Sequence, residues 1–234
     1  PLEDVSSVVN LQAGVIDGHF RGGRSNEVKY LVDGVAVNDV YSGQSSLSPE
    51  INSIEEVQVI TGTFNAEYGE ALSGVVNQVT KVAGDKFDGN VSFYSGDYVS
   101  SNSDVFTNID DVNPSDVYNI QGFISGPIPG IESFAKIFLS GRYNYDEGSI
   151  YGQRVFNPPD SSDFSANNSE DWYVGSTGDS SYVPMNSNQR LSLQAKLALN
   201  VGGGKGLVLS GFYQDSKYRD YNHLYKLNPD GDYN

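Results

Sequence analysis

The chain has 234 residues, and 30 acidic side chains against 14 basic ones give it a net charge of −16 at pH 7. This balance argues against a nucleic-acid ligand, whose phosphates would be repelled. The absence of cysteine excludes a disulfide framework and a thiolate metal site or nucleophile within the chain. The 26 glycines and 16 tyrosines favour strands and turns. No apolar run reaches the about 18 residues of a membrane helix, so a membrane location would require a β-barrel.

The N-terminal part is predicted to be a small α/β unit. Residues 1–10 carry valines at helical spacing and predict a short amphipathic helix. Residues 28–32 and 35–38 are two β-type runs separated by Asp33 and Gly34. This dipeptide indicates a tight hairpin, because a type I′ turn needs positive φ at both central residues.

A polar loop at residues 39–53 separates this hairpin from two further β-type runs, at residues 57–61 and 74–80. Loops of this length in compact domains are often functional. The link between the two runs contains Gly62 and Gly69, which suit tight turns and close backbone approach.

After Lys81 the pattern changes to long alternating strands. Five are predicted, at residues 89–95, 117–125, 135–145, 189–201 and 207–217. In the fourth, leucines, alanine and valine at odd positions oppose Ser192, Gln194, Lys196 and Asn200. One apolar and one polar face in strands of about ten residues fit a transmembrane barrel with a wet lumen. A soluble sandwich would alternate as well, so alternation alone does not decide.

The connections between these strands are long and short in strict alternation. Residues 96–116 and 146–188 are long, residues 126–134 and 202–206 are short, and a long tail follows from residue 218. Long loops on one side and short turns on the other are typical of outer-membrane barrels. Both long loops are acidic, and the second holds seven acids against Arg154 alone. Since five strands cannot close such a barrel without unpaired edges, we expect a piece of a longer chain.

Several spaced motifs in the first 85 residues resemble one family. In chain order they are Phe20-Arg21-Gly22-Gly23, Val32-Asp33-Gly34-Val35, Glu55-Glu56-Val57-Gln58-Val59, Tyr68-Gly69 with Ala71, and Gly74-Val75-Val76-Asn77 closing on Thr80-Lys81. This order resembles the plug domain of TonB-dependent outer-membrane receptors. The resemblance implies a plug domain at residues 1–85, and at 86–234 the first strands and loops of an antiparallel barrel of about 22 strands with the plug in its lumen.

The resemblance also implies a polar latch between plug and barrel. Plug arginines and glutamates of this family form ion pairs within the plug and with the barrel wall, and the matching residues here are Arg21, Arg24, Glu55, Glu56 and Glu67. Losing one partner of a buried pair costs about 3–5 kcal/mol, which makes such pairs a plausible latch. Solvated surface charge is an equal alternative for the glutamates.

Substrate contact in the resembling family comes from outward-pointing plug loops and the lumenal wall. By position, the loop after the hairpin is the candidate, and the expected contact residues are Arg21, Asn38, Asp39, Tyr41, Ser42 and Gln44. An ordinary polar loop is the alternative. The segment Asn65-Ala66-Glu67-Tyr68-Gly69 departs from the Leu-Tyr-Gly version common in siderophore receptors, which argues against an iron chelate as the substrate and leaves large ligands such as glycans or peptides open.

No catalytic site is predicted. His19 and His223 are far apart, and no catalytic motif spacing is present. No cofactor or metal site is expected, although calcium in acidic loops is an alternative at Asp110, Asp111, Asn113 and Asp116, or at Asp230 and Asp232. Neither group has the spacing of a twelve-residue calcium loop.

The resemblance implies an outer-membrane transport receptor rather than an enzyme. An extracellular ligand (glycan, peptide or metal chelate) would bind over the plug, and the TonB-ExbB-ExbD complex would supply energy from the periplasm. Further expected partners are outer-membrane lipid and a surface lipoprotein. The long loops would be extracellular. Two alternatives stay open: a non-transporting subunit of a larger outer-membrane complex, and a soluble β-rich binding module.

Overall fold

The computed structural model describes residues 5–62, 69, 71–102 and 105–232. Internal contacts divide the chain into two compact units. Unit 1 comprises Pro1–Val91, Gln121–Arg142 and Ser192–Tyr213, and unit 2 comprises Ser92–Ile120, Tyr143–Leu191 and Gln214–Asn234. The domain boundary expected at residue 85 stays a prediction.

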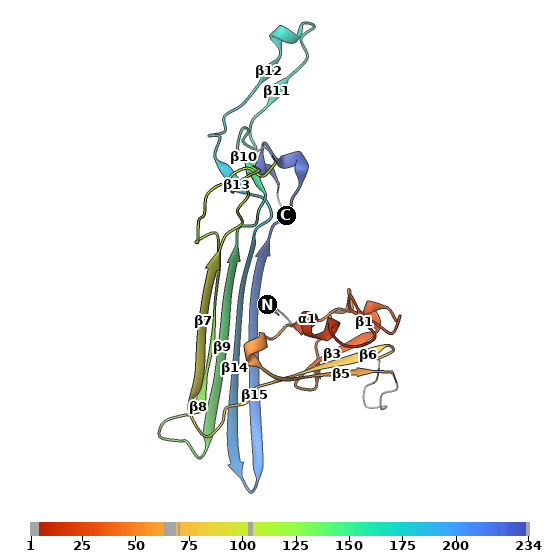
Figure 1. The fold of residues 1–234 in the computed structure, drawn as a ribbon, viewed down its shortest axis with the longest axis vertical. Helices are drawn as coiled ribbons and strands as arrows, with labels where there is room; N and C mark the ends of the chain where they lie inside the picture. The colour runs from red at the N-terminus through yellow and green to blue at the C-terminus, as the bar shows by residue number, and fades with distance from the viewer. Residues whose placement is uncertain (1–4, 63–68, 70, 103–104, 233–234) are drawn as a thin grey trace. The chain divides into compact units, whose positions relative to one another are not determined.

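Unit 1 contains a four-stranded sheet in the order β4-β3-β6-β5. Its strands are β3 (Val28–Val32), β4 (Val35–Ala36), β5 (Ile54–Thr61) and β6 (Gly74–Thr80), and β3 and β6 run parallel. The helix α1 (Val5–Asn10) lies over this sheet (Figure 1). Between them is a small apolar core of Val5, Val9, Val15, Phe20, Val28 and Val76. The predicted α/β unit is confirmed.

Two Asp-Gly turns shape this unit. At the predicted hairpin, Asp33 and Gly34 have φ of 51° and 81°, as a type I′ turn requires. The short strands β1 (Val15–Ile16) and β2 (His19–Phe20) form a second hairpin around Asp17 and Gly18, whose φ values are 49° and 75°. The sequence analysis did not predict this second hairpin, although it carries the same dipeptide.

Short 3-10 turns precede two strands of the sheet. They are η1 (Ser25–Glu27) before β3 and η2 (Ile51–Ser53) before β5. The strand β4 ends two residues earlier than predicted. There, the Asn38 side chain accepts a hydrogen bond from the Tyr30 amide and donates one to the Val28 carbonyl, replacing main-chain pairing.

The five predicted long strands are present, with ends within two residues of those expected. They form one sheet in the order β15-β14-β9-β8-β7, so strands adjacent in sequence are adjacent in space (Figure 1). Their bounds are β7 (Asp88–Gly96), β8 (Val117–Pro127), β9 (Ala135–Asp146), β14 (Asn188–Gly202) and β15 (Lys205–Tyr218).

The strand β14 buries its polar face. On β14, Ser192, Gln194 and Lys196 are 7%, 6% and 3% exposed, whereas Leu193 between them is 47% exposed. On β15 the consecutive residues Leu207, Val208 and Leu209 are all exposed. A soluble sheet would do the reverse, so this arrangement fits a wall that meets lipid outside and polar groups inside.

Unit 2 contains two small antiparallel pairs where a long loop was expected. The pairs are β10 (Tyr151–Gln153) with β13 (Tyr182–Pro184), and β11 (Ser162–Asp163) with β12 (Tyr173–Val174). Three 3-10 turns accompany them, η3 (Ser169–Asp171), η4 (His223–Tyr225) and η5 (Pro229–Gly231). Among the described residues, no helix is long and apolar enough to cross a membrane.

Candidate functional site

One charged network in unit 1 joins the plug sheet to β14. The Lys196 Nζ lies 2.8 Å from Asp33 Oδ2 and donates to the Thr80 carbonyl at 2.9 Å. Asp33 also accepts hydrogen bonds from the Thr80 amide and hydroxyl, both at 2.8 Å. Gln194, two residues before Lys196, donates to the Thr80 hydroxyl at 3.0 Å. The β3–β4 turn and the end of β6 are therefore bound to one point on β14.

A second ion pair connects the loop before β5 to β9. The Arg142 guanidinium donates to Glu50 Oε2 at 3.1 Å, and the two side chains are only 15% and 8% exposed. Two residues after Glu50, the Asn52 carbonyl accepts a hydrogen bond from Lys81 at 2.9 Å. The Lys81 Nζ also lies 4.6 Å from the centre of the Phe123 ring on β8. In both ion pairs the plug supplies the acid and the long strands supply the base.

A third ion pair lies at the chain segment that leaves the plug. Lys136 on β9 is 2.6 Å from Asp85, whose side chain is 90% exposed. The hydrogen bond from Lys136 holds the pKa of Asp85 below its usual value. Because this pair is exposed, it contributes less to stability than the two more buried ion pairs.

The two arginines expected in the latch lie on the exposed surface of the plug. Arg21 has φ of 48°, and its guanidinium lies beside the backbone of Gly62. The Arg24 amide donates a hydrogen bond to the Glu27 carboxylate at 3.1 Å. Within the described residues neither arginine forms an ion pair, so their role as a latch stays a prediction.

The expected latch glutamates are placed differently from the acids that bind the strands. Glu55 and Glu56 are exposed on β5 and form no ion pair within the described part of the chain. Glu67 lies outside the described residues. Their latch role therefore also stays a prediction, while Asp33 and Glu50, which sequence reasoning passed over, make the buried contacts.

The sequence did carry a signal for the basic partners. On the polar face of β14, Lys196 is the one charge between Ser192, Gln194 and Asn200. Arg142 lies on the polar face of β9, which also carries Lys136 and Asp146. A cation on a strand face needs an acidic partner when that face is buried.

The loop expected to touch substrate is a compact turn. The Asp39 carboxylate accepts hydrogen bonds from the Tyr41 amide and from the amide and hydroxyl of Ser42. These Ser42 bonds hold the pKa of Asp39 below its usual value. The Asn38 amide group donates to the Gly43 carbonyl, and Asn38 pairs with Ser45 as a β-bridge. Asn38, Asp39 and Ser42 thus build the loop.

Two of the expected contact residues keep side chains available for a ligand. Tyr41 is 100% exposed at the tip of the loop, next to Val40 at 93%. Gln44 lines a cavity of about 290 Å³ inside the plug, together with Tyr30 and Gln78. Burial raises the pKa of Tyr30. No contact between the loop and Arg21 is seen in the described residues, so that part of the expected site stays a prediction.

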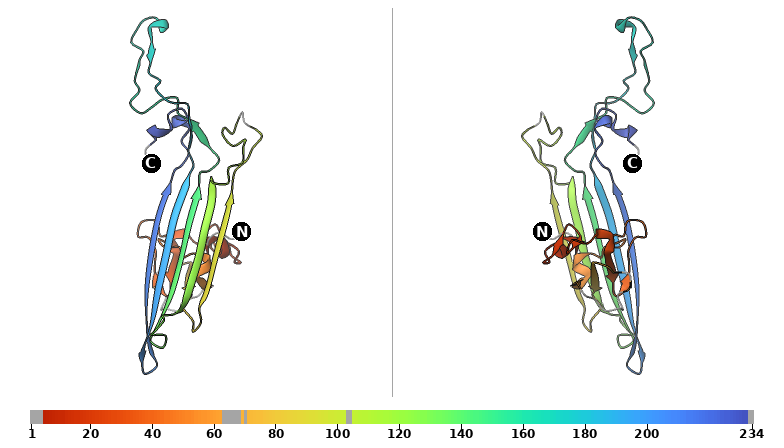
Figure 2. Two further views of the ribbon diagram at one scale, coloured as in Figure 1. Left: turned by 90° about the vertical axis from the view of Figure 1, so that its left-hand side faces the viewer. Right: turned by 90° about the vertical axis from the view of Figure 1, so that its right-hand side faces the viewer.

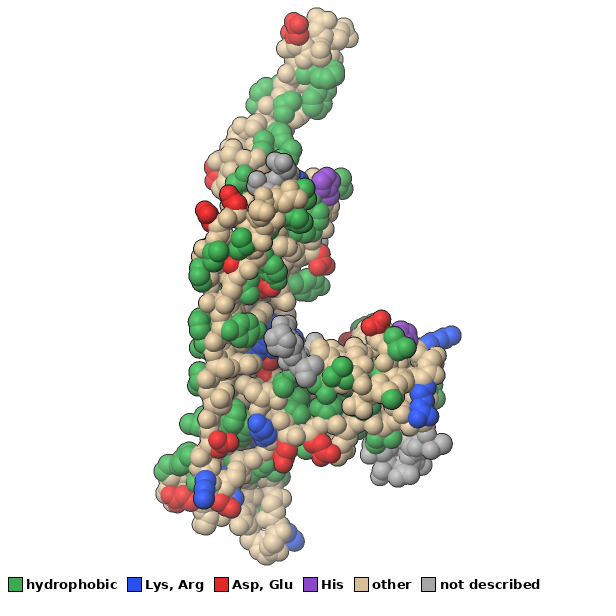
Figure 3. Space-filling view, in the orientation of Figure 1, with side chains coloured by type: hydrophobic (Ala, Val, Ile, Leu, Met, Phe, Trp, Pro, Cys, Tyr) green, Lys and Arg blue, Asp and Glu red, His purple; other side chains and the backbone are tan. Residues whose placement is uncertain are grey.

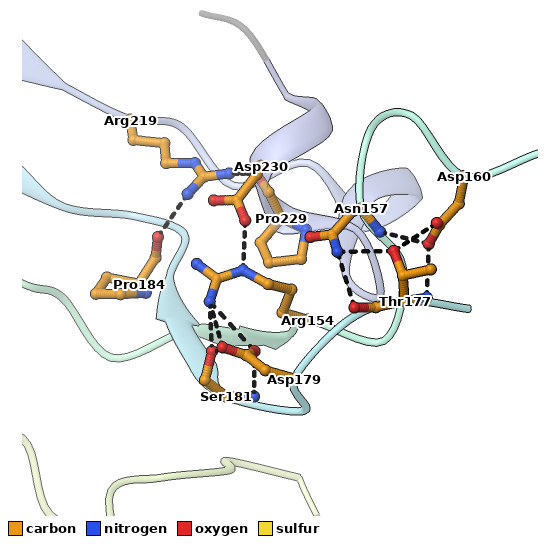
Figure 4. Close-up of polar contacts among 10 residues, drawn as sticks. All are labelled: Arg154, Asn157, Asp160, Thr177, Asp179, Ser181, Pro184, Arg219, Pro229 and Asp230. Atoms are coloured by element: carbon orange, nitrogen blue, oxygen red, sulfur yellow. Dashed lines mark hydrogen bonds and ion pairs between the residues drawn. The ribbon is translucent and has the colours of Figure 1, made fainter. Parts of the chain in front are cut away.

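In unit 2, Arg154 connects two long loops. It donates through Nε to Asp230 at 2.5 Å, and through Nη1 to Asp179 at 3.1 Å and Ser181 at 2.7 Å (Figure 4). Asp230 belongs to the segment after β15, and Asp179 to the loop between β9 and β14. The Ser181 hydrogen bonds, with Arg154 adding to them, lower the pKa of Asp179 to about 2.

Two further contacts surround this arginine (Figure 4). Asp160 accepts hydrogen bonds from the amide of Asn157 and from the amide and hydroxyl of Thr177, which closes the neck of the loop. Arg219 donates to the carbonyls of Pro184 and Pro229. The two loops are therefore joined by one polar network with Arg154 near its middle.

The expectation of no metal site, and the alternative of calcium in the acidic loops, are both untested. In the described part of the chain, no group of three or more His, Cys, Asp or Glu side chains is placed to hold a metal ion. Asp230 is engaged by Arg154, and Asp116 accepts a hydrogen bond from Asn113 at 2.5 Å.

Comparisons with known proteins agree with this architecture. Residues 5–76 match the model of the TonB-dependent Receptor Plug Domain. The TonB-dependent transporter Oar of Myxococcus xanthus is 36% identical over 72 residues, which are 31% of this chain and 7% of that protein. The vitamin B12 transporter BtuB of Vibrio vulnificus is 44% identical over 62 residues, which are 26% of this chain and 10% of that protein.

Among solved structures, the siderophore receptor PirA of Pseudomonas aeruginosa has the same fold. The TM-score is 0.59 at 19% identity, covering 93% of this chain and 31% of that one. Residues 5–76 thus match the plug-domain family, and the described strands share the fold of the solved receptor. The chain spans a tenth or less of the curated relatives it matches and about a third of PirA.

Proposed function

We propose that this chain is the plug and first wall strands of a TonB-dependent transport receptor in a bacterial outer membrane. In this proposal an extracellular ligand binds over the plug, and the TonB-ExbB-ExbD complex supplies the energy that moves the plug. The observation that carries the proposal is two ion pairs, between Asp33 and the buried Lys196 and between the buried Glu50 and Arg142. They hold the plug to the wall by polar contacts that can be broken and remade.

A polar interface suits a plug that must move. Two apolar surfaces packed together exclude water, and separating them loses the burial energy without replacement. Charged and hydrogen-bonding groups can instead exchange their partners for water as the surfaces part. The buried serine and glutamine on the same strand face, Ser192 and Gln194, fit this requirement.

The exposed tip of the loop at residues 38–45 is the proposed ligand contact in the plug. Tyr41 offers an aromatic ring on a turn fixed by Asp39, so binding would cost little ordering of the loop. Such a ring suits a sugar ring, a peptide side chain or an aromatic chelator. The matches to vitamin B12 and siderophore proteins therefore add cobalamin and ferric chelates to the ligands worth testing.

The proposal is tested by uptake into cells that carry the whole protein. A panel of labelled oligosaccharides, oligopeptides, cobalamin and ferric siderophores is offered to a strain with TonB and to an isogenic strain without it. We expect one class to accumulate only when both the protein and TonB are present. Binding to cells without TonB-dependent uptake, for every class in the panel, would contradict transport.

The second candidate function is a non-transporting subunit of a larger outer-membrane assembly. The exposed aromatic and acidic hairpin of unit 2, described below, favours a protein partner and is compatible with either function. The exposed apolar strand faces argue against the soluble binding module, because they would need a cover in water.

A further inference from the structure

The hairpin β11–β12 exposes an aromatic surface within unit 2. Phe164, Trp172 and Tyr173, here named the aromatic tip, are 57%, 48% and 61% exposed. The Phe164 and Trp172 rings pack edge to face with centres 5.4 Å apart, and the Trp172 Nε1 donates to the Ala166 carbonyl at 3.0 Å. Large aromatic side chains are costly to leave in water, so a fixed exposed group of them indicates a contact surface.

The hairpin has little support of its own. Its two strands pair through only two residue pairs, Ser162 with Val174 and Asp163 with Tyr173. Figures 1 and 2 show it extending beyond the β10–β13 pair of the same unit. An isolated two-stranded hairpin is at best marginally stable in water. A partner that covers the aromatic tip would supply the missing burial.

The charge around the aromatic tip is purely acidic. Asp163, Glu170 and Asp171 are exposed beside the rings, and no lysine or arginine occurs between Arg154 and Arg190. Arg154 itself is engaged by Asp179 and Asp230. Hydrogen bonds from Ser165 hold the pKa of Asp163 below its usual value. Figure 3 shows hydrophobic side chains gathered along this hairpin with an acidic one at its end.

We infer that the aromatic tip is a docking surface for a polypeptide segment rich in lysine or arginine. Indole, phenyl and phenol rings bind such cations over their faces, and the flanking carboxylates pair with them. The same acids would steer a cationic segment to the tip from a distance and repel an acidic one. A neutral glycan would use the rings but gain nothing from the three acids.

The inference is tested on the whole protein purified from membranes in detergent, without any need for transport. The probe is a dodecapeptide of alternating lysine and serine, compared with its glutamate counterpart and with maltoheptaose. We expect binding of the lysine peptide alone, weakening as salt rises. Trp172→Ala should weaken it about tenfold, and Trp172→Phe, which keeps a ring without the Nε1 donor, should retain most of it.

Two further variants separate the contribution of the acids from that of the rings, and the effect of the aromatic tip from that of any exposed aromatic residue. Asp171→Asn combined with Glu170→Gln should weaken binding and reduce its salt dependence. Phe106→Ala removes an aromatic residue that is 41% exposed in another loop, and it should leave binding unchanged. Binding of maltoheptaose in place of the lysine peptide, equal binding of the glutamate peptide, an equal loss in Phe106→Ala, or no loss in Trp172→Ala would each overturn the inference.

Discussion

Lys196 and Asp33 form an unequal ion pair. Their charged atoms are 2.8 Å apart, yet the lysine side chain is 3% exposed and the aspartate 28%. The two partners therefore depend on each other to different degrees. A buried cation without its anion has no water to replace it, whereas the aspartate keeps both solvent and the two Thr80 hydrogen bonds.

The inequality predicts which substitution costs more. Asp33→Asn keeps the type I′ turn but leaves the Lys196 ammonium buried without a carboxylate, and it should destabilise the docked plug by about 3–5 kcal/mol. Lys196→Met removes the charge and should cost less, about 1–3 kcal/mol. The measurement is the urea-induced release of the plug. It is monitored with a fluorophore on one engineered cysteine, because the chain has no cysteine of its own. Equal costs for the two variants would contradict the account.

The pair of Glu50 and Arg142 predicts a rescue by exchange of charge. Glu50→Arg alone places two cations together at a site where the side chains are 8% and 15% exposed, and Arg142→Glu alone places two anions there. Each single variant should make cells permeable to vancomycin, because the plug is loosened. The double variant should restore more than half of the resistance. No recovery in the double variant would show that the two residues do not act on each other.

The hairpin turn predicts a purely backbone effect at Gly34. Its φ is 81°, and an added Cβ would meet nothing within 4 Å, so Gly34→Ala should cost about 1–2 kcal/mol of plug stability through conformation alone. Gly84→Ala is the matched control, because that glycine has equal space without a positive φ. Thermal unfolding of the plug measures both. A loss as large at Gly84 would rule out the conformational explanation.

The polar network around Arg154 predicts that the stability of these loops depends on pH. The pKa of Asp179 is lowered to about 2 from an ordinary value of 3.8, so its contribution is fully present above 3.8 and is lost as the pH falls through about 2. The protection factors for hydrogen exchange in the loop at residues 146–188, which are corrected for the intrinsic pH dependence of exchange, should therefore be constant from pH 7 to about 4 and fall below that. Arg154→Gln should lower these protection factors already at pH 7, whereas Asp171→Asn, at an exposed position, should not.

The regular parts of the fold were predictable because their causes are local. The turn at Asp33 and Gly34 follows from a dipeptide, and the strand β14 follows from thirteen residues of alternation. Both patterns need only the nearest neighbours along the chain. The hairpin at Asp17 and Gly18 was equally local and was missed because its strands are only two residues long.

The contacts of the candidate site were not predictable in this way. Lys196 meets Thr80 across 116 residues of sequence, and Arg142 meets Glu50 across 92. With 30 acids in the chain, no rule of spacing selects Asp33 and Glu50 as their partners. The loop pairs β10–β13 and β11–β12 likewise depend on distant contacts, such as Arg154 with Asp230, 76 residues apart.

Restraint of the plug against β14 tests the central claim most directly. Thr80→Cys with Gln194→Cys places two thiols where the native side chains are hydrogen-bonded at 3.0 Å, and a reducible bismaleimide can join them. We predict that the joined protein binds but does not import the ligand identified by the uptake panel, that cleaving the link restores TonB-dependent import, and that either single cysteine variant is unaffected. Full import by the joined protein would show that the plug need not leave β14 and would contradict the account.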